Sequence, residues 1–270
     1  MDMRVLPQAV HTVQHGAGDR DVLAIHCTLA HSGAWRGVIK ALDDVARVTA
    51  FDLLSHGRSP DWDGQGDYQD RTVEIAETLL SRPMDVVGHS FGATVALRLA
   101  AACPDRVRSL TLIEPVYFCF AQQTAPDVVA AHQAEAAPLW AMLERGEVET
   151  AARTFNAMWS DVGPGWDQLP DVARASMVRG IPIVPASQRA LFDDPMGLSA
   201  PGGLDAVRMP VLLLRGSRTQ PVIAAVNAAL ETRLPDVRSV VVEGAGHMLP
   251  ITHPRAVAEP LRALFAATPV

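Results

Sequence analysis

The chain has 270 residues, of which 49% are hydrophobic and 20% are charged, and its formal net charge at pH 7 is −7. This length and composition are typical of a globular protein that buries a substantial core, as one large domain with an insertion or as two small domains. The acidic balance and the lack of any basic run argue against a nucleic-acid or anionic-membrane partner.

Three sequence features bear on the cellular compartment. The first residues lack a charged stretch followed by an apolar one, so we expect no secretory signal. No apolar run approaches the roughly 18 residues of a membrane span. The cysteines, Cys27, Cys103 and Cys119, are odd in number and lack metal-ligand spacing, so we expect buried thiols in a reducing compartment. The sequence thus predicts a cytoplasmic protein without a membrane partner.

Apolar runs alternate with segments of helical periodicity along most of the chain. The apolar runs predict strands at residues 9–14, 21–25, 47–51, 85–88, 108–113, 211–214 and 239–242. The helical segments lie at residues 36–42, 69–80, 93–102 and 222–230, with a closing helix from residue 254 onward. This alternation predicts an α/β fold with a doubly wound, mostly parallel sheet. Ligands bind such sheets beyond the carboxyl ends of the strands. Four polar residues fall there: His26, Asp52, Ser90 and Glu114.

The composition changes between residues 116 and 203. This segment has helical periodicity, several proline breaks and three of the five tryptophans, Trp140, Trp159 and Trp166. We interpret it as a helical cap inserted into an α/β core made of residues 1–115 and 204–270. The aromatic side chains of the cap are expected either to pack its own core or to line a pocket.

The segment Gly88-His89-Ser90-Phe91-Gly92 joins an apolar run to a stretch of small residues with helical periodicity. A strand, a sharp turn and a helix form the context of a nucleophile elbow, which exposes a serine at the start of the helix. Glycines are needed on both sides because a Cβ at either position would clash in the turn. The free N–H groups of the helix start favour developing negative charge near the serine. An ordinary serine in a glycine-rich turn is the alternative.

Three further motifs lie at predicted strand ends: His26-Cys27-Thr28, Asp52 with His56, Gly57 and Ser59, and Gly244-Ala245-Gly246-His247. With the Ser90 motif they occur in the order of the α/β-hydrolase superfamily, which the chain resembles over nearly its whole length. The resemblance implies the α/β-hydrolase fold with a helical cap. It also implies Ser90 as the nucleophile and His247 as the base that a serine hydroxyl needs. His253 is the other candidate for the base, but it precedes Pro254 at the start of a predicted helix, which favours a structural role.

The resemblance further implies an oxyanion hole formed by the backbone N–H groups of Phe91 and Thr28. The family usually has glycine where Cys27 stands, so this loop departs from the family pattern. The candidate pocket residues are Cys27, His31, Trp35, His89, Trp140 and Trp159. Trp35 can equally anchor the following helix. The loop histidines can likewise have a structural role, with hydrogen-bond partners for their ring nitrogens: His26, His31, His56 and His89.

The acid that orients the base departs from the usual family position. The family usually places Asp after the penultimate strand, but this chain has Gly216-Ser217-Arg218-Thr219 and no carboxylate from Arg215 to Leu230. Some members carry the acid after the strand that follows the elbow, where Glu114 stands. Burial of an unpaired carboxylate is costly, and orienting His247 would explain its place. An ion pair between Glu114 and a cap arginine is the alternative.

These residues together predict a serine hydrolase with the triad Ser90, His247 and Glu114. We expect it to cleave a carboxylic ester or lactone of a small, fairly apolar substrate through an acyl-enzyme, without a metal or an organic cofactor. A carbon–carbon bond hydrolase and a hydroxynitrile-lyase-like enzyme are alternatives on the same fold, and a non-catalytic ligand-binding member is a third. The sequence leaves open whether the chain forms a homodimer.

Overall fold

The structure, a computed structural model, describes residues 9–160 and 164–269. Within these ranges a seven-stranded sheet forms the centre, in the order β1-β3-β2-β4-β5-β6-β7. The strands are β1 (Thr12–His15), β2 (Arg20–Ile25), β3 (Ala46–Phe51), β4 (Met84–His89), β5 (Val107–Ile113), β6 (Val211–Gly216) and β7 (Val237–Val242). β1 is antiparallel to β3, and the other five pairs are parallel. The predicted α/β class with a mostly parallel, doubly wound sheet is confirmed.

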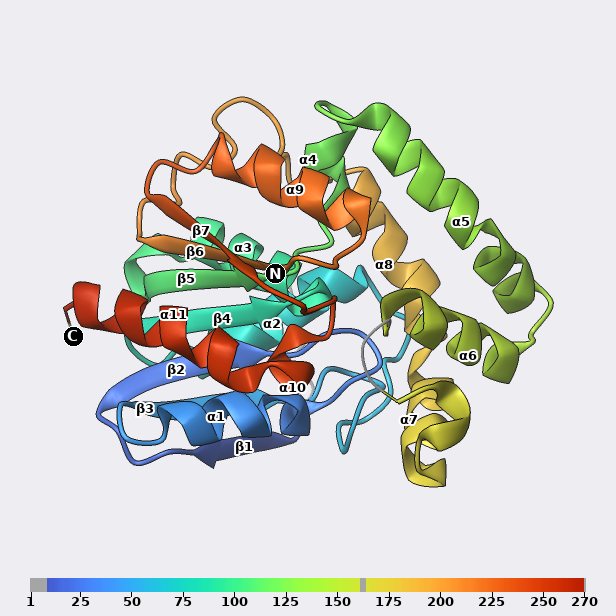
Figure 1. The fold of residues 1–270 in the computed structure, drawn as a ribbon, viewed down its shortest axis with the longest axis horizontal. Coiled ribbons are helices and arrows are strands. Elements are labelled where there is room, and N and C mark those ends of the chain that lie inside the picture. Colours follow the sequence, from blue (N-terminus) through green and yellow to red (C-terminus); the bar gives the residue numbers. More distant parts are fainter. Residues whose placement is uncertain (1–8, 161–163, 270) are drawn as a thin grey trace, which may run out of the picture.

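Helices cover both faces of the sheet (Figure 1). One face carries α1 (Arg36–Leu42), α10 (Leu249–Thr252) and α11 (Pro254–Ala267), and the other carries α2 (Tyr68–Leu79), α3 (Phe91–Ala102) and α9 (Pro221–Glu231). Val22 and Ala24 of β2 belong to the apolar cluster of α1 and α11, whereas Leu23 and Ile25 belong to the opposite cluster. Successive side chains of a strand alternate between faces. Burial on both sides therefore explains the continuous apolar run of this strand.

Five α-helices lie between β5 and β6 in the described chain: α4 (Phe118–Gln122), α5 (Pro126–Glu144), α6 (Val148–Trp159), α7 (Asp171–Gly180) and α8 (Ile183–Phe192). Figure 1 shows α5 to α8 beside the sheet, beyond the carboxyl ends of its strands. An apolar cluster of their own includes Leu139, Trp166 and Ile181. Phe118 and Phe120 of α4 pack instead with the core of the sheet. The cap boundaries at residues 116 and 203 stay a prediction.

The helices of the described ranges include none that is long and apolar enough to cross a membrane. Their bounds differ by a few residues from those expected. The helix after the elbow begins at Phe91 rather than at residue 93, because the backbone of Ser90 completes the turn in a single residue. The short helix Leu249–Thr252 was not expected, although Pro250 in its first turn suits a helix start.

Two loops at the carboxyl ends of β2 and β3 are joined by buried imidazoles. His26 Nε2 accepts a hydrogen bond from the Leu53 N–H at 2.9 Å, and His56 Nε2 accepts one from the Leu29 N–H at 3.0 Å. Each ring donates through Nδ1 to a backbone carbonyl, at 2.7 and 2.8 Å respectively. Protonation of either ring at Nε2 would break one of these bonds. Neutral histidines therefore fix the two loops to each other.

Asp52 adds a further link between the same loops. Its two carboxylate oxygens accept hydrogen bonds from the Ser32 N–H at 2.6 Å and the Arg58 N–H at 2.8 Å. Burial raises the pKa of this carboxyl, but these N–H bonds outweigh it and hold the pKa below its ordinary value. A Cβ on Gly57, whose φ is 50°, would come within 2.1 Å of the same carboxylate. The loop after β3 thus requires glycine at this position.

The opposite edge of the sheet is held by a buried ion pair. Arg20 Nε and Nη2 donate to the two carboxylate oxygens of Asp85 at 2.6 and 3.0 Å, and Asp85 is fully buried. Arg108 and Ser109 donate to the same carboxylate at 3.0 and 2.6 Å. Arg20 also donates to two carbonyls at the end of α11. One carboxylate thus joins β2, β4, β5 and, through Arg20, the last helix.

We expect Asp85→Ala to lower the free energy of unfolding by about 3–5 kcal/mol, because it leaves Arg20 buried without a counter-charge. Urea unfolding monitored by circular dichroism measures this loss. Asp44→Asn is the matched control, since Asp44 forms an exposed pair with Arg262 and its removal should cost far less. Equal losses for the two variants would contradict the prediction.

The stability of the fold should also depend on pH through His56. Burial lowers the pKa of this ring to about 4, and nearby Arg179 adds to the effect. In the unfolded chain this ring binds its proton near pH 6.5. Between pH 6.5 and about 4 the unfolded state therefore binds a proton that the folded state does not, and the free energy of unfolding falls with the pH. We expect His56 alone to remove about 3 kcal/mol between pH 6.5 and 4, and nothing above pH 6.5.

Urea unfolding at a series of pH values tests this window. His56→Gln keeps an acceptor for the Leu29 N–H but does not titrate, so its stability should fall less steeply over the same range. The same pH slope in both proteins would refute the role of His56.

Candidate active site

Ser90 lies in a strained turn between β4 and α3. Its φ of 56° and ψ of −117° are rare for a residue with a side chain, and its N–H donates to the Ile113 carbonyl at 2.8 Å. A Cβ on Gly88 would approach the Gly92 carbonyl oxygen to 2.3 Å, and a Cβ on Gly92 would approach the Ile25 carbonyl oxygen to 2.3 Å. Both glycines are required because the turn, α3 and the end of β2 meet so closely.

Ser90, His247 and Glu114 form one continuous hydrogen-bonded chain. His247 Nε2 lies 3.0 Å from Ser90 Oγ, and His247 Nδ1 lies 2.9 Å from Glu114 Oε2. The exposed fractions of the three residues are 6%, 4% and 0% in the same order. Because an ionised carboxylate only accepts hydrogen bonds, Nδ1 carries the imidazole proton and Nε2 accepts from the serine hydroxyl. This arrangement can take a proton from Ser90 and return it to a leaving group.

Glu114 follows β5 directly and has a φ of 50°. Its Oε1 accepts a hydrogen bond from the Gly216 N–H at 2.7 Å, and its Oε2 accepts one from the Thr219 hydroxyl as well as from His247. Gly216 and Thr219 belong to the loop in which the family usually carries Asp, so this loop supplies donors to the carboxylate instead. Among residues 9–160 and 164–269, no cap arginine forms an ion pair with Glu114.

The N–H groups of Phe91 and Thr28 have no hydrogen-bond acceptor within the described chain. The Phe91 N–H is one of the unpaired donors at the start of α3. Thr28 lines the cavity that reaches Ser90. Unpaired donors beside a nucleophile are what a developing oxyanion requires. Their role as the oxyanion hole stays a prediction.

Cys27 occupies the position of a family glycine without backbone strain. The described residues other than glycine with positive φ are Leu29, Ser55, Ser90, Glu114 and Asp194, and Cys27 is not one of them. Its carbonyl accepts a hydrogen bond from the Ala30 N–H at 3.2 Å, which closes the turn. Burial raises the pKa of the Cys27 thiol to about 12, so the thiol stays protonated. The strained position of this loop is Leu29, whose N–H is bound by His56.

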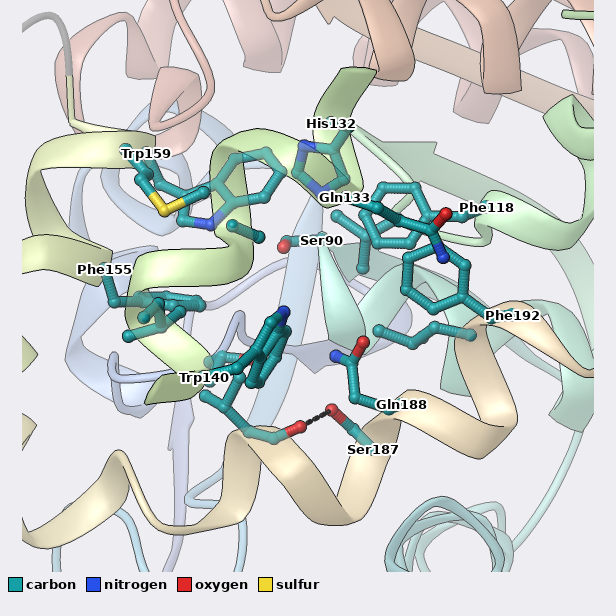
Figure 2. A pocket seen from close by; sticks show the side chains of 17 residues that line it. Ser90, Phe118, His132, Gln133, Trp140, Phe155, Trp159, Ser187, Gln188 and Phe192 are labelled. Atoms are coloured by element: carbon teal, nitrogen blue, oxygen red, sulfur yellow. Dashed lines mark hydrogen bonds between the residues drawn. The ribbon is translucent and has the colours of Figure 1, made fainter. Parts of the chain in front are cut away.

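Two spaces meet at Ser90. The first is a cavity of about 260 Å³ beneath the cap, with Trp140 and Trp159 in its wall (Figure 2). The second is an open groove of about 1120 Å³, with Cys27 and His31 in its wall. Four of the six predicted pocket residues therefore line a space that reaches the serine. The described ranges contain no group of three or more His, Cys, Asp or Glu side chains that could hold a metal ion.

The structure corrects the placement of the other two predicted pocket residues. Trp35 is 2% exposed, packs in the core beneath α1 and lines neither space, so it anchors that helix. His89 is 1% exposed and also lines neither space, because its ring turns back to donate from Nε2 to the His247 carbonyl at 2.8 Å. Burial and the neighbouring His247 lower the pKa of His89 well below its ordinary value. The rival base His253 contacts Thr252, not Ser90.

Trp159 brings the end of α6 against the imidazole of His247. The two ring centroids are 4.5 Å apart and the ring planes are inclined by 45°. His132 lies 5.5 Å from Trp159, and Phe118 lies 4.8 Å from His132, so a row of rings extends from the base into the cap. Trp159 therefore packs the cap directly against the imidazole of His247.

Some cavity residues were not singled out in the sequence. They are the polar residues His132, Gln133, Ser187 and Gln188, with several apolar neighbours (Figure 2). The His132 ring is 8% exposed, and its Nδ1 has no partner in the described chain. The lining positions repeat at helical spacing, as at 132, 136, 139 and 140 on α5 and at 184, 187, 188 and 191 on α8. This helical periodicity in the sequence could have indicated which residues line the cavity.

Comparison with known proteins matches residues 22–254 to the family described as alpha/beta hydrolase fold. The lipase LipV of Mycobacterium tuberculosis is 31% identical over 260 residues, which cover 94% of this chain and 96% of the lipase. The pimeloyl-[acyl-carrier protein] methyl ester esterase of Nitrosomonas europaea is 30% identical over 243 residues, covering 88% of this chain and 92% of the esterase. A solved hydrolase from Oleispira antarctica matches with a TM-score of 0.72 at 17% identity, over 93% of each chain. The chain therefore belongs to the α/β-hydrolase fold family and is a hydrolase.

Proposed function

We propose that this hydrolase cleaves carboxylic esters, lactones included, of small and fairly apolar acids. The observation that carries the proposal is the continuous chain from Ser90 Oγ through His247 to Glu114, with contacts of 3.0 and 2.9 Å. Two relatives that match most of the chain are named as a lipase and as a methyl ester esterase, which supports an ester as the bond that is cleaved.

In the first half-reaction, Ser90 Oγ attacks the ester carbonyl and His247 Nε2 takes the hydroxyl proton. The carbonyl oxygen becomes an oxyanion, which the N–H groups of Phe91 and Thr28 stabilise. Glu114 holds the imidazole in the tautomer that accepts at Nε2 and favours the imidazolium that forms. His247 then gives the proton to the departing alcohol oxygen, which leaves an acyl group on Ser90.

In the second half-reaction, a water molecule attacks the acyl carbon, with His247 as the base again. The bond between the acyl carbon and Ser90 Oγ breaks, and the proton on His247 returns to the serine oxygen. The products are the free acid and the restored serine hydroxyl.

The cavity beside Ser90 supports an apolar acyl group as the substrate. Its walls are mainly aromatic and aliphatic side chains, including Phe118, Trp140, Phe155 and Phe192 (Figure 2). Each methylene of an acyl chain that enters this cavity contributes roughly 0.8 kcal/mol of binding. A volume of about 260 Å³ limits the acyl group to a short or medium chain.

A fluorophosphonate probe should label Ser90, and mass spectrometry of the Ser90 peptide should show the added mass. In His247→Ala we expect labelling to be slower by about 10²–10⁴-fold, because no base takes the serine proton. Circular dichroism confirms that the variant is folded. A folded wild-type protein that is not labelled would refute the activated serine and favour a non-catalytic member of the family. Labelling without turnover of esters or lactones would favour the carbon–carbon hydrolase or the lyase.

Glu114→Gln should fold normally and lose about 10²–10⁴-fold in kcat on an ester such as 4-nitrophenyl butyrate, because the amide no longer fixes the productive tautomer of His247. Thr219→Val removes one hydrogen bond to the carboxylate but keeps its charge, so we expect a smaller loss. Glu259→Gln, an exposed carboxylate on α11, controls for the loss of a charge. Turnover of Glu114→Gln close to that of the wild type would exclude Glu114 as the acid.

A further inference from the structure

The two spaces that meet at Ser90 differ in charge. Thr28, Ser90, Phe155 and Trp159 belong to the walls of both, so the serine lies at the boundary between them. None of the 17 residues that line the cavity beneath the cap is Asp, Glu, Lys or Arg. Burial also lowers the pKa of His132 in its wall, so this ring is neutral. A charged group in this cavity would lose its hydration without gaining a counter-charge.

The wall of the open groove carries three cationic side chains, Arg36, Lys40 and Arg58. All three are exposed, and none has an ion pair within the described ranges. Arg36 and Lys40 are four residues apart on α1, so they lie on the same face of the helix. Arg58 projects from the loop after β3, whose backbone is fixed by Asp52.

The carboxylates of the groove do not balance these cations. The groove wall contains two, Asp43 and Asp52. Both oxygens of Asp52 already accept hydrogen bonds from backbone N–H groups. A local surplus of positive charge stands out in a chain whose net charge is −7. Exposed Val172 and Ile251 also line the groove and offer apolar surface for a carbon skeleton.

We propose that the groove binds the alcohol or thiol portion of the substrate, and that this portion carries an oxyanion, either a carboxylate or a phosphate. The inference rests on the proposed ester hydrolysis and adds the chemistry of the leaving group to it. The neutral acyl group fills the cavity beneath the cap, and the anionic group lies among Arg36, Lys40 and Arg58. Charge complementarity assigns the two halves of the substrate to the two spaces.

The reaction leaves the anionic group unchanged. The bond between the acyl carbon and the ester oxygen or thioester sulfur breaks as the bond to Ser90 Oγ forms. His247 passes the serine proton to the departing atom, and the leaving group departs through the open groove with its charge intact. The cations act on binding, so their effect belongs mainly to KM.

Three butyrate esters test the proposal, formed with 4-hydroxybenzoate, 4-hydroxybenzamide and 4-hydroxyphenyl phosphate. The first two share the ring and the acyl group and differ in charge, and the third replaces the carboxylate by a phosphate. We measure kcat/KM for each ester and form the ratio of each anionic ester to the neutral amide ester. The larger of the two ratios identifies which oxyanion the groove prefers.

The triple variant Arg36→Gln, Lys40→Gln, Arg58→Gln should lower the ratio for the preferred anionic ester about tenfold, mainly through a higher KM. This tenfold change corresponds to about 1.4 kcal/mol. The matched control replaces Arg189, Arg208 and Arg238, three exposed arginines that line neither space, and should keep the wild-type ratio. Raising NaCl from about 0.05 M to about 0.5 M should lower the ratio in the wild type but not in the groove variant.

If the ratios of the wild type, the groove variant and the control variant agree within twofold while all esters are hydrolysed, the groove does not bind the anionic group. Ester hydrolysis would remain supported. Failure to hydrolyse any of the esters, with Ser90 unlabelled by the fluorophosphonate, would overturn ester hydrolysis and this inference together. The three groove residues are exposed, so circular dichroism should show that their variant is folded.

Discussion

The first turn of α3 packs directly on the end of β2, and this contact determines where Ser90 and the loop of Thr28 lie. A Cβ on Gly92 would come within 2.3 Å of the Ile25 carbonyl oxygen and 2.5 Å of the His26 carbonyl oxygen. β2 continues from this point into the loop that carries Thr28, so the turn of Ser90 and that loop are neighbours. Two imidazoles and one carboxylate then hold the loop in place. Donors that are fixed in advance need no reorganisation when charge develops on the substrate.

The position of Glu114 follows from the pairing of the central strands. β4 and β5 are adjacent and parallel, and His89 is paired with Ile113 at their carboxyl ends. The residues that follow, Ser90 and Glu114, therefore leave the sheet side by side. A carboxylate that is fully buried needs partners, and it finds them in the Gly216 N–H, the Thr219 hydroxyl and His247. The loop after β6, the strand next to β5, thus supplies two hydrogen-bond donors to this carboxylate.

Much of the fold could be predicted because its signals are local. Apolar runs that alternate with helical periodicity define the parallel sheet, and the glycines around Ser90 mark a turn that only a tight strand-to-helix junction requires. The missing carboxylate after Gly216 and the lone Glu114 at a strand end were also visible, and the structure brings Glu114 to His247. Each of these inferences depends on where a strand ends, which the sequence pattern gives directly.

The side-chain directions in the loops could not be predicted in the same way. Trp35 and His89 lie next to the site in sequence, yet both turn into the protein, because core packing and a carbonyl partner hold them there. The effect of Cys27 depends on its backbone conformation, which is not left-handed, whereas Leu29 two residues later has a positive φ. The polar residues of the cavity come from cap helices, whose orientation depends on tertiary contacts with the core.

The lack of charged side chains in the cavity beneath the cap has a consequence for product release. In the proposed reaction a neutral acyl group enters this cavity, and hydrolysis turns it into an acid that ionises at neutral pH. The new carboxylate forms at Ser90, beside the N–H groups of Phe91 and Thr28, and no Asp, Glu, Lys or Arg lines the rest of the cavity. Because the carboxylate would lose its hydration there without gaining a counter-charge, the acid does not move deeper into the cavity. The groove is therefore the side from which the acid leaves.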